Sequence, residues 1–324
     1  MTAGVAIRSA ARLTAASAAL ILQVAFGRGF GKFGGTTQDH IPFRRGEQRR
    51  LSTLAGWAAV LLVSALAIGT AGCAGIDSAS GDFTPVHRGV LTVVTQPLPT
   101  AGFWDGTDAH PTGGLEYGIA RALAHRFGLR LVVRTEPFAR IVAGHLDGAD
   151  LALSLITPTS AREQALDFSA PYIDAPPALL VRTGASVPDL ASAQALRWAV
   201  ESDTTLESTI ADVIQPDQPP LQFAGREGVL RALNSGPAEA TLFDLPAAIA
   251  IAHTDPKLTV AAHLANTEPI AAALPSGSHN VEAVSSAMRG LQADGTIDRL
   301  AKRWLGVSIT DSEADIPLLR TTES

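Results

Sequence analysis

The feature that constrains this chain most is an apolar strand followed at once by a predicted helix start that carries a lone arginine. Residues 151–156 (LALSLI) form an apolar run typical of a buried strand, and Pro158 interrupts it. Ser160 and Glu163 then have the spacing of a capping box. The pattern predicts a strand, a short turn and a helix that begins near Thr159 or Ser160.

Arg162 lies just inside that predicted helix start, where it can act as a receptor for a carboxylate. The first N–H groups of a helix have no intrahelical partner and carry partial positive charge, so an anion is stable beside them. The guanidinium adds a planar fork that can hold both carboxylate oxygens. The local residues leave a second interpretation open, an arginine on a solvated helix face, because most arginines are exposed.

The segments upstream predict a strand followed by a helix and a second strand. Residues 91–95 (LTVVT) alternate like a strand. A helix is predicted over about residues 116–127, Gly128 closes it, and strand-like residues follow. Strands that alternate with helices are typical of an α/β fold.

Together these motifs resemble the first lobe of the bacterial extracellular solute-binding proteins of family 3, which are the amino-acid receptors of ABC importers. The shared features are GLEY at residues 114–117 with the helix after it, Asp150, Thr159, Arg162, and DFSAPY at residues 167–172. A second match lies at residues 281–306, which resemble the family's closing helix pair. The resemblance covers about residues 86–306. It implies an α/β, two-lobed periplasmic-binding-protein-like (type II) fold with a hinge between the lobes.

A turn-rich segment around Pro188 marks the expected change of lobe. On this basis, lobe 1 comprises residues 86–183 and 269–307, and lobe 2 comprises residues 184–268. Residues 308–324 are expected to form a C-terminal tail.

The start of lobe 2 offers a second helix N-terminus. The strand-like Trp198–Val200 leads toward Thr204, and Thr204 with Glu207 again has capping-box spacing. The resemblance implies that backbone N–H groups of Thr204 and Thr205 reach the ligand carboxylate from the opposite side of the cleft. Asp203 stands where the family often has glycine, and its charge could weaken the anion site by like-charge repulsion.

Asp244 ends the apolar run at residues 240–243, and an acid at the carboxyl end of a buried strand lies where open α/β sheets bind ligands. The family places its ammonium-binding aspartate here. The alternative is that Asp244 only caps the helix that starts at Leu245-Pro246.

The resemblance implies further ligand contacts that the local residues leave open. Ser154 and Thr159 match positions that hydrogen-bond the ligand through backbone or hydroxyl groups. Phe103 or Trp104 matches an aromatic lid, or else only covers the lobe edge. Glu116 either reaches the cleft or simply begins a helix, where an acid favours the helix dipole.

The N-terminal residues have the layout of a secretory signal. A basic stretch at residues 44–50 precedes an apolar run at about residues 54–68, and Thr70-Ala71-Gly72-Cys73 follows. Cys73 is the only cysteine, so no disulfide can form within the chain. Ala-Gly-Cys resembles a bacterial lipobox, which implies that Cys73 is lipidated. Residues 1–72 are then the leader and lipoprotein signal peptide.

Under this interpretation, residues 73–85 form a flexible tether between the lipid and the folded body. The alternatives for the apolar run and the thiol are an uncleaved transmembrane anchor and a chance free cysteine. With either a lipid or a transmembrane anchor, the body is expected on the extracytoplasmic face of the cell membrane, periplasmic or at the cell surface. Because a signal normally begins close to its basic region, we also expect translation to start later than Met1.

Charge and motifs argue against several other classes of protein. Before Cys73 the chain has eight Lys and Arg residues against two Asp and Glu, whereas the remainder has 17 against 29. So acidic a body makes a nucleic-acid partner unfavourable. The histidines have no zinc-ligand spacing, and neither a G-x-S-x-G elbow nor a phosphate-binding G-x-x-x-x-G-K-[ST] loop occurs. The sequence therefore predicts no metal site, no cofactor and no enzymatic activity.

These features predict the substrate-binding lipoprotein of an ABC importer, a monomer that binds a small amino acid or related carboxylate between its lobes and passes it to an ABC permease. The alternatives are a non-transport sensor or cell-wall-associated lipoprotein, or a periplasmic dehydratase on the same fold. GLEY is closer to the binding-protein-like domain of membrane-bound lytic transglycosylase F. That enzyme carries its catalytic glutamate in a separate C-terminal domain, and about 18 residues follow Gly306 here, so we expect no transglycosylase activity.

Overall fold

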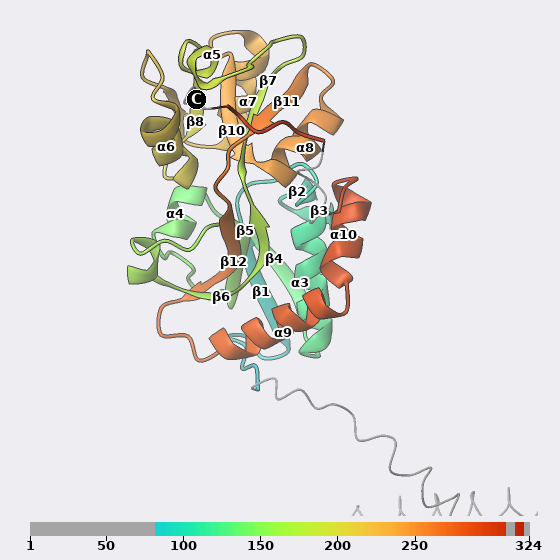
Figure 1. Cartoon of the computed structure of the whole chain (residues 1–324). Helices are drawn as coiled ribbons and strands as arrows, with labels where there is room; N and C mark the ends of the chain where they lie inside the picture. The colour runs from blue at the N-terminus through green and yellow to red at the C-terminus, as the bar shows by residue number, and fades with distance from the viewer. Residues whose placement is uncertain (1–81, 309–314, 321–324) are drawn as a thin grey trace, which may run out of the picture. The chain divides into compact units, whose positions relative to one another are not determined.

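The computed structural model describes residues 82–308 and 315–320, which belong to one compact unit of the chain, Ile76–Ser324 (Figure 1). The predicted signal peptide, Cys73 and most of the predicted tether lie outside the described residues.

Lobe 1 is built on a five-stranded sheet in the order β4-β1-β5-β12-β6. Its strands are β1 (Val90–Thr95), β4 (Arg130–Thr135), β5 (Leu151–Ile156), β6 (Leu166–Ala175) and β12 (Glu268–Pro275). β1 pairs in parallel with β4 and β5, whereas β12 runs antiparallel to β5 and β6. All six residues of β5 are buried, as expected for a central strand covered on both faces. The strand predicted at residues 151–156 is confirmed.

Helices cover this sheet. They are α3 (Leu115–Arg126), α4 (Phe138–Val142), α9 (Val281–Ala293) and α10 (Thr296–Trp304), and a short hairpin, β2 (Asp105–Thr107) and β3 (His110–Gly113), precedes α3. α3 packs against α9 and α10, while α4 packs against β1 and β5. Leu115, Ile119 and Leu123 recur every four residues and are fully buried, so α3 turns one apolar stripe inward.

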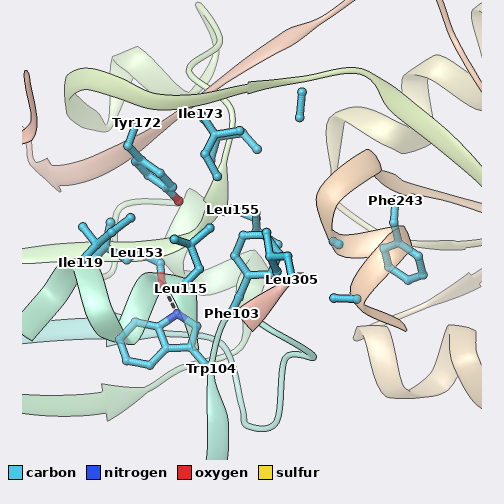
Figure 2. Close-up of a cluster of buried hydrophobic side chains, with 14 of the residues drawn as sticks. Phe103, Trp104, Leu115, Ile119, Leu153, Leu155, Tyr172, Ile173, Phe243 and Leu305 are labelled. Carbon is cyan, nitrogen blue, oxygen red and sulfur yellow. Dashed lines mark hydrogen bonds between the residues drawn. The ribbon is translucent and has the colours of Figure 1, made fainter. Parts of the chain in front are cut away.

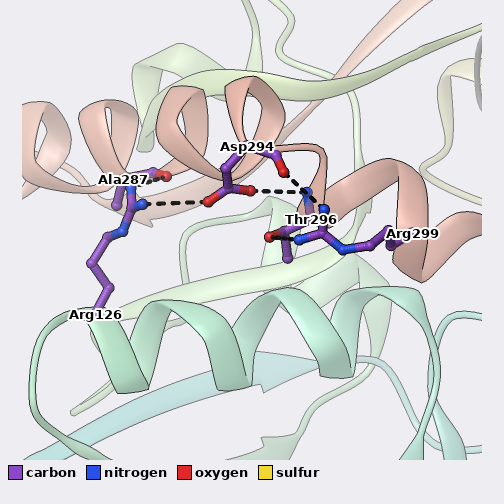
Figure 3. A network of polar contacts seen from close by, with 5 residues as sticks. All are labelled: Arg126, Ala287, Asp294, Thr296 and Arg299. Carbon is purple, nitrogen blue, oxygen red and sulfur yellow. Dashed lines mark hydrogen bonds and ion pairs between the residues drawn. The ribbon is translucent and has the colours of Figure 1, made fainter.

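Polar contacts at the end of α3 fasten the three helices together (Figure 3). Arg126 donates to the Ala287 carbonyl at 3.0 Å and faces the Asp294 carboxylate at 3.7 Å. Asp294 in turn accepts from the Thr296 backbone N–H at 2.9 Å. One arginine of α3 therefore contacts both α9 and the turn that starts α10.

Lobe 2 contains a three-stranded antiparallel sheet in the order β10-β7-β11 and a parallel pair, β8 and β9. Its strands are β7 (Pro177–Arg182), β8 (Ala199–Glu201), β9 (Leu221–Phe223), β10 (Ala240–Asp244) and β11 (Leu258–His263). Its helices are α5 (Leu190–Gln194), α6 (Thr205–Thr209), α7 (Arg226–Ser235) and α8 (Leu245–Thr254), and a π-helical turn at Ile210–Ile214 follows α6. A bridge between Trp198 and Ala240 links the two groups of strands.

Two strand connections cross between the lobes, from β6 to β7 and from β11 to β12 (Figure 1). The sheet pairing differs from the predicted lobe boundary, because β7 pairs with β10 and β11 and so places residues 177–182 in lobe 2. Only Pro176 separates β6 from β7, so the chain passes from one sheet to the other almost without a turn. The turn-rich segment around Pro188 lies inside lobe 2.

Both ends of the described chain are held against the lobes. Phe83 stacks on Phe127 with ring centroids 4.3 Å apart, so the expected tether ends before Phe83. In the expected C-terminal tail, Leu319 is buried and its N–H donates to the His263 carbonyl at 2.8 Å. The Arg320 carbonyl accepts from Leu190 N–H at 2.9 Å, so the described part of the tail runs along lobe 2.

Candidate ligand-binding cleft

Arg162 is buried, with 8% of its surface exposed, and its guanidinium joins the two lobes. Nη1 donates to the Thr157 carbonyl of lobe 1 at 2.7 Å, and Nη2 donates to the Asp203 carbonyl of lobe 2 at 2.9 Å. The guanidinium carbon lies 5.4 Å from the centre of the Phe138 ring, which supports it from one side. The solvated helix face considered above is therefore wrong for this residue.

Burial lowers the pKa of the Arg162 guanidinium, and nearby carboxylates, Glu268 first, oppose the shift. Arginine remains charged under such conditions because its ordinary pKa is so high. Two of its five N–H donors hold backbone carbonyls, which leaves three for a ligand.

The helix expected at Thr159 or Ser160 is wrong. The chain makes a single 3-10 turn, Arg162–Gln164, and then enters β6 at Leu166. The Thr159 hydroxyl accepts from Arg162 N–H at 3.2 Å, so Thr159 caps this turn and not Ser160. Pairing of β6 with β12 along most of its length takes the chain out of the helix, because tertiary pairing overrides a local start signal.

On the opposite lobe, the loop before α6 approaches Arg162 through its backbone. Asp203 adopts a left-handed conformation with φ 65°, which aspartate tolerates better than most residues and which glycine adopts freely. The Asp203 carbonyl, and not its carboxylate, accepts the hydrogen bond from Arg162, and Asp203 as a whole is exposed. The Thr204 hydroxyl donates to the Glu201 carbonyl at 2.8 Å, and Glu207 accepts from the Asp203 N–H at 3.2 Å.

Asp244 ends β10 and immediately precedes α8, but its side chain forms no capping hydrogen bond with that helix. The carboxylate is therefore available to the cleft, and only 7% of the residue surface is exposed. Burial, with Glu268 adding to it, raises the pKa of Asp244 to about 7, although Arg226 opposes the rise. A buried carboxylate with so high a pKa is an unfavourable charge that a ligand cation would stabilise.

Arg162 and Asp244 line the same cavity, one from each lobe. Ser154, Thr204 and Thr205 line it as well. The cavity volume is about 30 Å³, which is room for about two water molecules. An amino-acid head is larger than this space, so the cleft must widen to hold one.

Glu116, Phe103 and Trp104 do not line this cavity. All three are fully buried, and Figure 2 shows the two aromatic rings inside a cluster of buried side chains to which both lobes contribute. Neither ring is therefore a lid in this structure. Both residues lie between β1 and α3 and are buried among residues from distant parts of the chain, and Trp104 Nε1 also donates to the Leu153 carbonyl of β5. A local sequence pattern does not reveal such contacts.

Glu116 instead organises the backbone behind the cleft. It accepts from Trp104 Nε1 at 2.6 Å, from Leu155 N–H at 2.8 Å and from the Tyr172 hydroxyl. Burial raises its pKa, and these hydrogen bonds oppose the rise. Leu155 lines the cavity and has φ 53°, a conformation rare for a leucine, so Glu116 holds a strained residue of the cleft wall in place.

Four residues that the sequence predictions missed, Gln96, Phe138, Glu201 and Arg226, line both this cavity and a larger one of about 690 Å³. Gln96 follows β1 and Glu201 ends β8, so both lie at the carboxyl ends of parallel strands. The rule that located Asp244 would have found them. Phe138 and Arg226 begin short helices, and no local signal distinguishes them from surface residues.

Within residues 82–308 and 315–320, no three His, Cys, Asp or Glu side chains are grouped so that they could hold a metal ion. In the same part of the chain, no helix combines the length and apolar character needed to cross a bilayer.

Comparison with known proteins adds an independent line of evidence. The model of the bacterial extracellular solute-binding proteins, family 3, matches residues 91–307. An amino acid ABC transporter substrate-binding protein from Streptococcus pneumoniae, bound to L-arginine, superposes with a TM-score of 0.61 at 23% identity, and the match covers 68% of this chain and 95% of that one. This likeness confirms the two-lobed α/β fold predicted from the sequence.

Two curated relatives illustrate the range of similar sequences. The membrane-bound lytic murein transglycosylase F of Ectopseudomonas mendocina is 29% identical over 261 residues, covering 74% of this chain and 52% of that protein. The L-cystine-binding protein TcyJ of Escherichia coli K12 is 25% identical over 236 residues, covering 69% of this chain and 85% of that protein. The chain thus spans about half the length of the transglycosylase and most of the length of the binding protein.

Proposed function

The chain belongs to the bacterial extracellular solute-binding proteins, family 3, and from this premise we propose that it is the amino-acid receptor of an ABC importer. The observation that carries the proposal is the pair Arg162 and Asp244, which face one cavity from opposite lobes. A guanidinium suits an α-carboxylate and a carboxylate suits an α-ammonium, so together they recognise the head common to all free α-amino acids.

Closure of the lobes would couple to binding through the same residues. Arg162 reaches the Asp203 carbonyl across the cleft, so the two lobes already touch at the base of the site. A ligand held by Arg162 on one lobe and by Asp244 on the other favours the closed form, because it makes both sets of contacts only there. This difference in contacts would let a permease distinguish the loaded receptor from the empty one.

The names of similar proteins support an amino-acid ligand, since one relative is an L-cystine-binding protein and one similar structure holds L-arginine. We propose that the chain is a receptor and not an enzyme, and that it acts outside the cytoplasmic membrane. The lipobox-like sequence at Cys73 supports attachment by a lipid, and the permease is its proposed partner.

Calorimetric titration with a panel of L-amino acids would test this function. Arg162→Ala should weaken binding by about 100-fold or more, since losing a buried charge-assisted pair removes roughly 3 kcal/mol. Arg289→Ala, a change to an arginine whose side chain is 54% exposed, is the matched control and should bind like the wild type. Wild-type affinity in Arg162→Ala, with a folded protein by circular dichroism, would refute the assigned site.

Substitution of the proposed lipidation residue tests localisation separately. Cys73→Ser should move the protein from the membrane fraction to the soluble fraction of cells that express the full chain. Retention of the serine variant in the membrane would support an uncleaved anchor in place of the lipid.

A further inference from the structure

Glu201 and Arg226 lie where the small cavity meets the large one, since both residues line both spaces. Glu201 ends β8 and is 6% exposed, and its Oε1 atom has no hydrogen-bond partner among the described residues. Arg226 begins α7, and its buried Nε and Nη1 atoms also lack a partner within the described chain. Buried polar atoms without partners are rare in folded proteins, so these three atoms need an explanation.

The two side chains are opposite in charge but do not neutralise each other by contact. No ion pair of 4.0 Å or less joins them among the ion pairs of the described residues. The Arg226 guanidinium carbon lies 5.1 Å from the centre of the Phe243 ring, which orients the fork. Burial raises the pKa of Glu201, and the charge and the backbone N–H of Arg226 oppose the rise, so the two residues attract each other although Glu201 Oε1 and Arg226 Nε and Nη1 form no hydrogen bond within the described chain.

We propose that the ligand has a second amino-acid head, with its distal carboxylate bound by Arg226 and its distal ammonium bound by Glu201. This inference rests on the proposed function, in which Arg162 and Asp244 bind the first head. An apolar ligand end would leave both buried groups unpaired. A purely cationic end would satisfy Glu201 but repel Arg226, and a purely anionic end would do the reverse.

The two cavities are proportioned for such a ligand. Of the two cavities, Arg162 and Asp244 line only the small one, which must widen to hold the first head. Glu201 and Arg226 line the small cavity and also the larger one, whose volume is about 690 Å³. Leu98, Phe138 and Leu230 are among the apolar residues that line the large cavity, and a hydrocarbon or sulfur-containing linker between two heads would pack on them.

Four probes of matched chain length test the proposal by calorimetric titration at pH 8. Norleucine has one head only, lysine adds a distal ammonium, 2-aminopimelate adds a distal carboxylate, and 2,6-diaminopimelate adds both. L-Cystine against S-methyl-L-cysteine repeats the comparison with a longer linker. At least one two-headed probe should bind at least about tenfold more tightly than its one-headed counterpart, because each added charged contact is strong when buried.

Variants then assign the two contacts. Glu201→Gln should weaken the two-headed probe about tenfold or more and change norleucine affinity less than about twofold. Arg226→Gln should weaken every probe, because Arg226 opposes the raised pKa of Asp244, but it should weaken 2-aminopimelate and 2,6-diaminopimelate about tenfold more than norleucine and lysine. Glu282→Gln and Arg231→Gln, changes to exposed side chains, are the matched controls and should leave every affinity unchanged.

The outcomes separate the two proposals. If one-headed amino acids bind as tightly as both two-headed probes, the second head is refuted and the amino-acid receptor stands. If no α-amino acid binds, both proposals fail. Equal loss for norleucine and diaminopimelate in Glu201→Gln would also overturn the inference, because it would show a structural role and not a contact with the distal ammonium.

Discussion

Acidification should weaken the binding of an α-amino acid, because Asp244 must be ionised to pair with the ligand ammonium. Its pKa is about 7 in the ligand-free protein, where burial and Glu268 raise it and Arg226 opposes the rise. A proton and the ligand ammonium then compete for one carboxylate. If Asp244 stays ionised in the complex, the association constant follows the ionised fraction of the free protein and falls about tenfold per pH unit below 7.

The size of the effect follows from that pKa. At pH 7.5 about three-quarters of Asp244 is ionised, and at pH 5 about 1%, so affinity should fall roughly 75-fold between the two. Calorimetric titration in two buffers with different ionisation enthalpies would also count protons. Binding at pH 5 should release about one proton from Asp244, whereas binding at pH 7.5 should release only about a quarter of one.

The same pKa also makes the free energy of unfolding depend on pH, in the direction opposite to ordinary acid denaturation. The folded pKa of about 7 exceeds the ordinary aspartate value of 3.8, so the folded state holds this proton more tightly than the unfolded chain. The contribution of Asp244 therefore favours folding most below pH 3.8 and is lost as pH rises toward 7. A pKa raised by about three pH units corresponds to about 4 kcal/mol of unfolding free energy, which is the upper end of the expected effect.

Asp244→Asn is the control for both measurements, because asparagine does not titrate. Its affinity should be low and nearly independent of pH from 5 to 7.5. The difference in unfolding free energy between wild type and variant should change with pH in the direction just described. Wild-type affinity that does not vary with pH, or the same pH slope in the asparagine variant, would refute the role of Asp244.

Three further variants test the supporting structure. Glu116→Gln should lower the free energy of unfolding by about 1–3 kcal/mol in urea titrations, since an amide cannot accept from all three of its donors, and it should weaken ligand binding through Leu155. Glu282→Gln should change neither. Asp203→Val should destabilise the protein by about 1–2 kcal/mol, because valine is strained at the left-handed φ of this position, whereas Asp203→Gly should keep wild-type affinity and escape that strain. Equal destabilisation by the two substitutions would argue against backbone strain at residue 203. Leu319→Ala should lower the free energy of unfolding by about 2 kcal/mol or more, measured by calorimetry, because Leu319 is buried. The control is Leu318→Ala, which changes the exposed neighbour and should alter the free energy of unfolding by less than about 0.5 kcal/mol.

Much of the local structure follows from the sequence. The strand at residues 151–156 agrees with β5 at both ends, and α8 begins directly after Asp244 as the Leu-Pro pair predicted. The helix predicted over 116–127 differs from α3 by one residue at each end. These segments are predictable because an apolar period or a cap acts over a few residues and needs no distant partner.

The site is only partly predictable for the same reason. Arg162 and Asp244 stand beside recognisable strand ends, so the sequence pointed to both, and Ser154 with the Thr204 loop followed from the resemblance. The local pattern left Glu116 open between the cleft and the start of a helix. It lies in the first turn of α3, and no local pattern shows its contact with Tyr172, 56 positions later. Glu201 and Arg226 could not be predicted as a pair, because they line the same two cavities only through the placement of β8 and α7.

The sequence by itself determined which short segments become strands and helices and which family they compose, since both are written in local pattern and motif order. The tertiary structure alone decided that the chain after Arg162 becomes strand β6, that β7 joins lobe 2, and that the aromatic pair Phe103 and Trp104 lies inside the core. Those outcomes depend on contacts between residues far apart in the chain, whose pairing and burial energies exceed the weak preferences of any single segment.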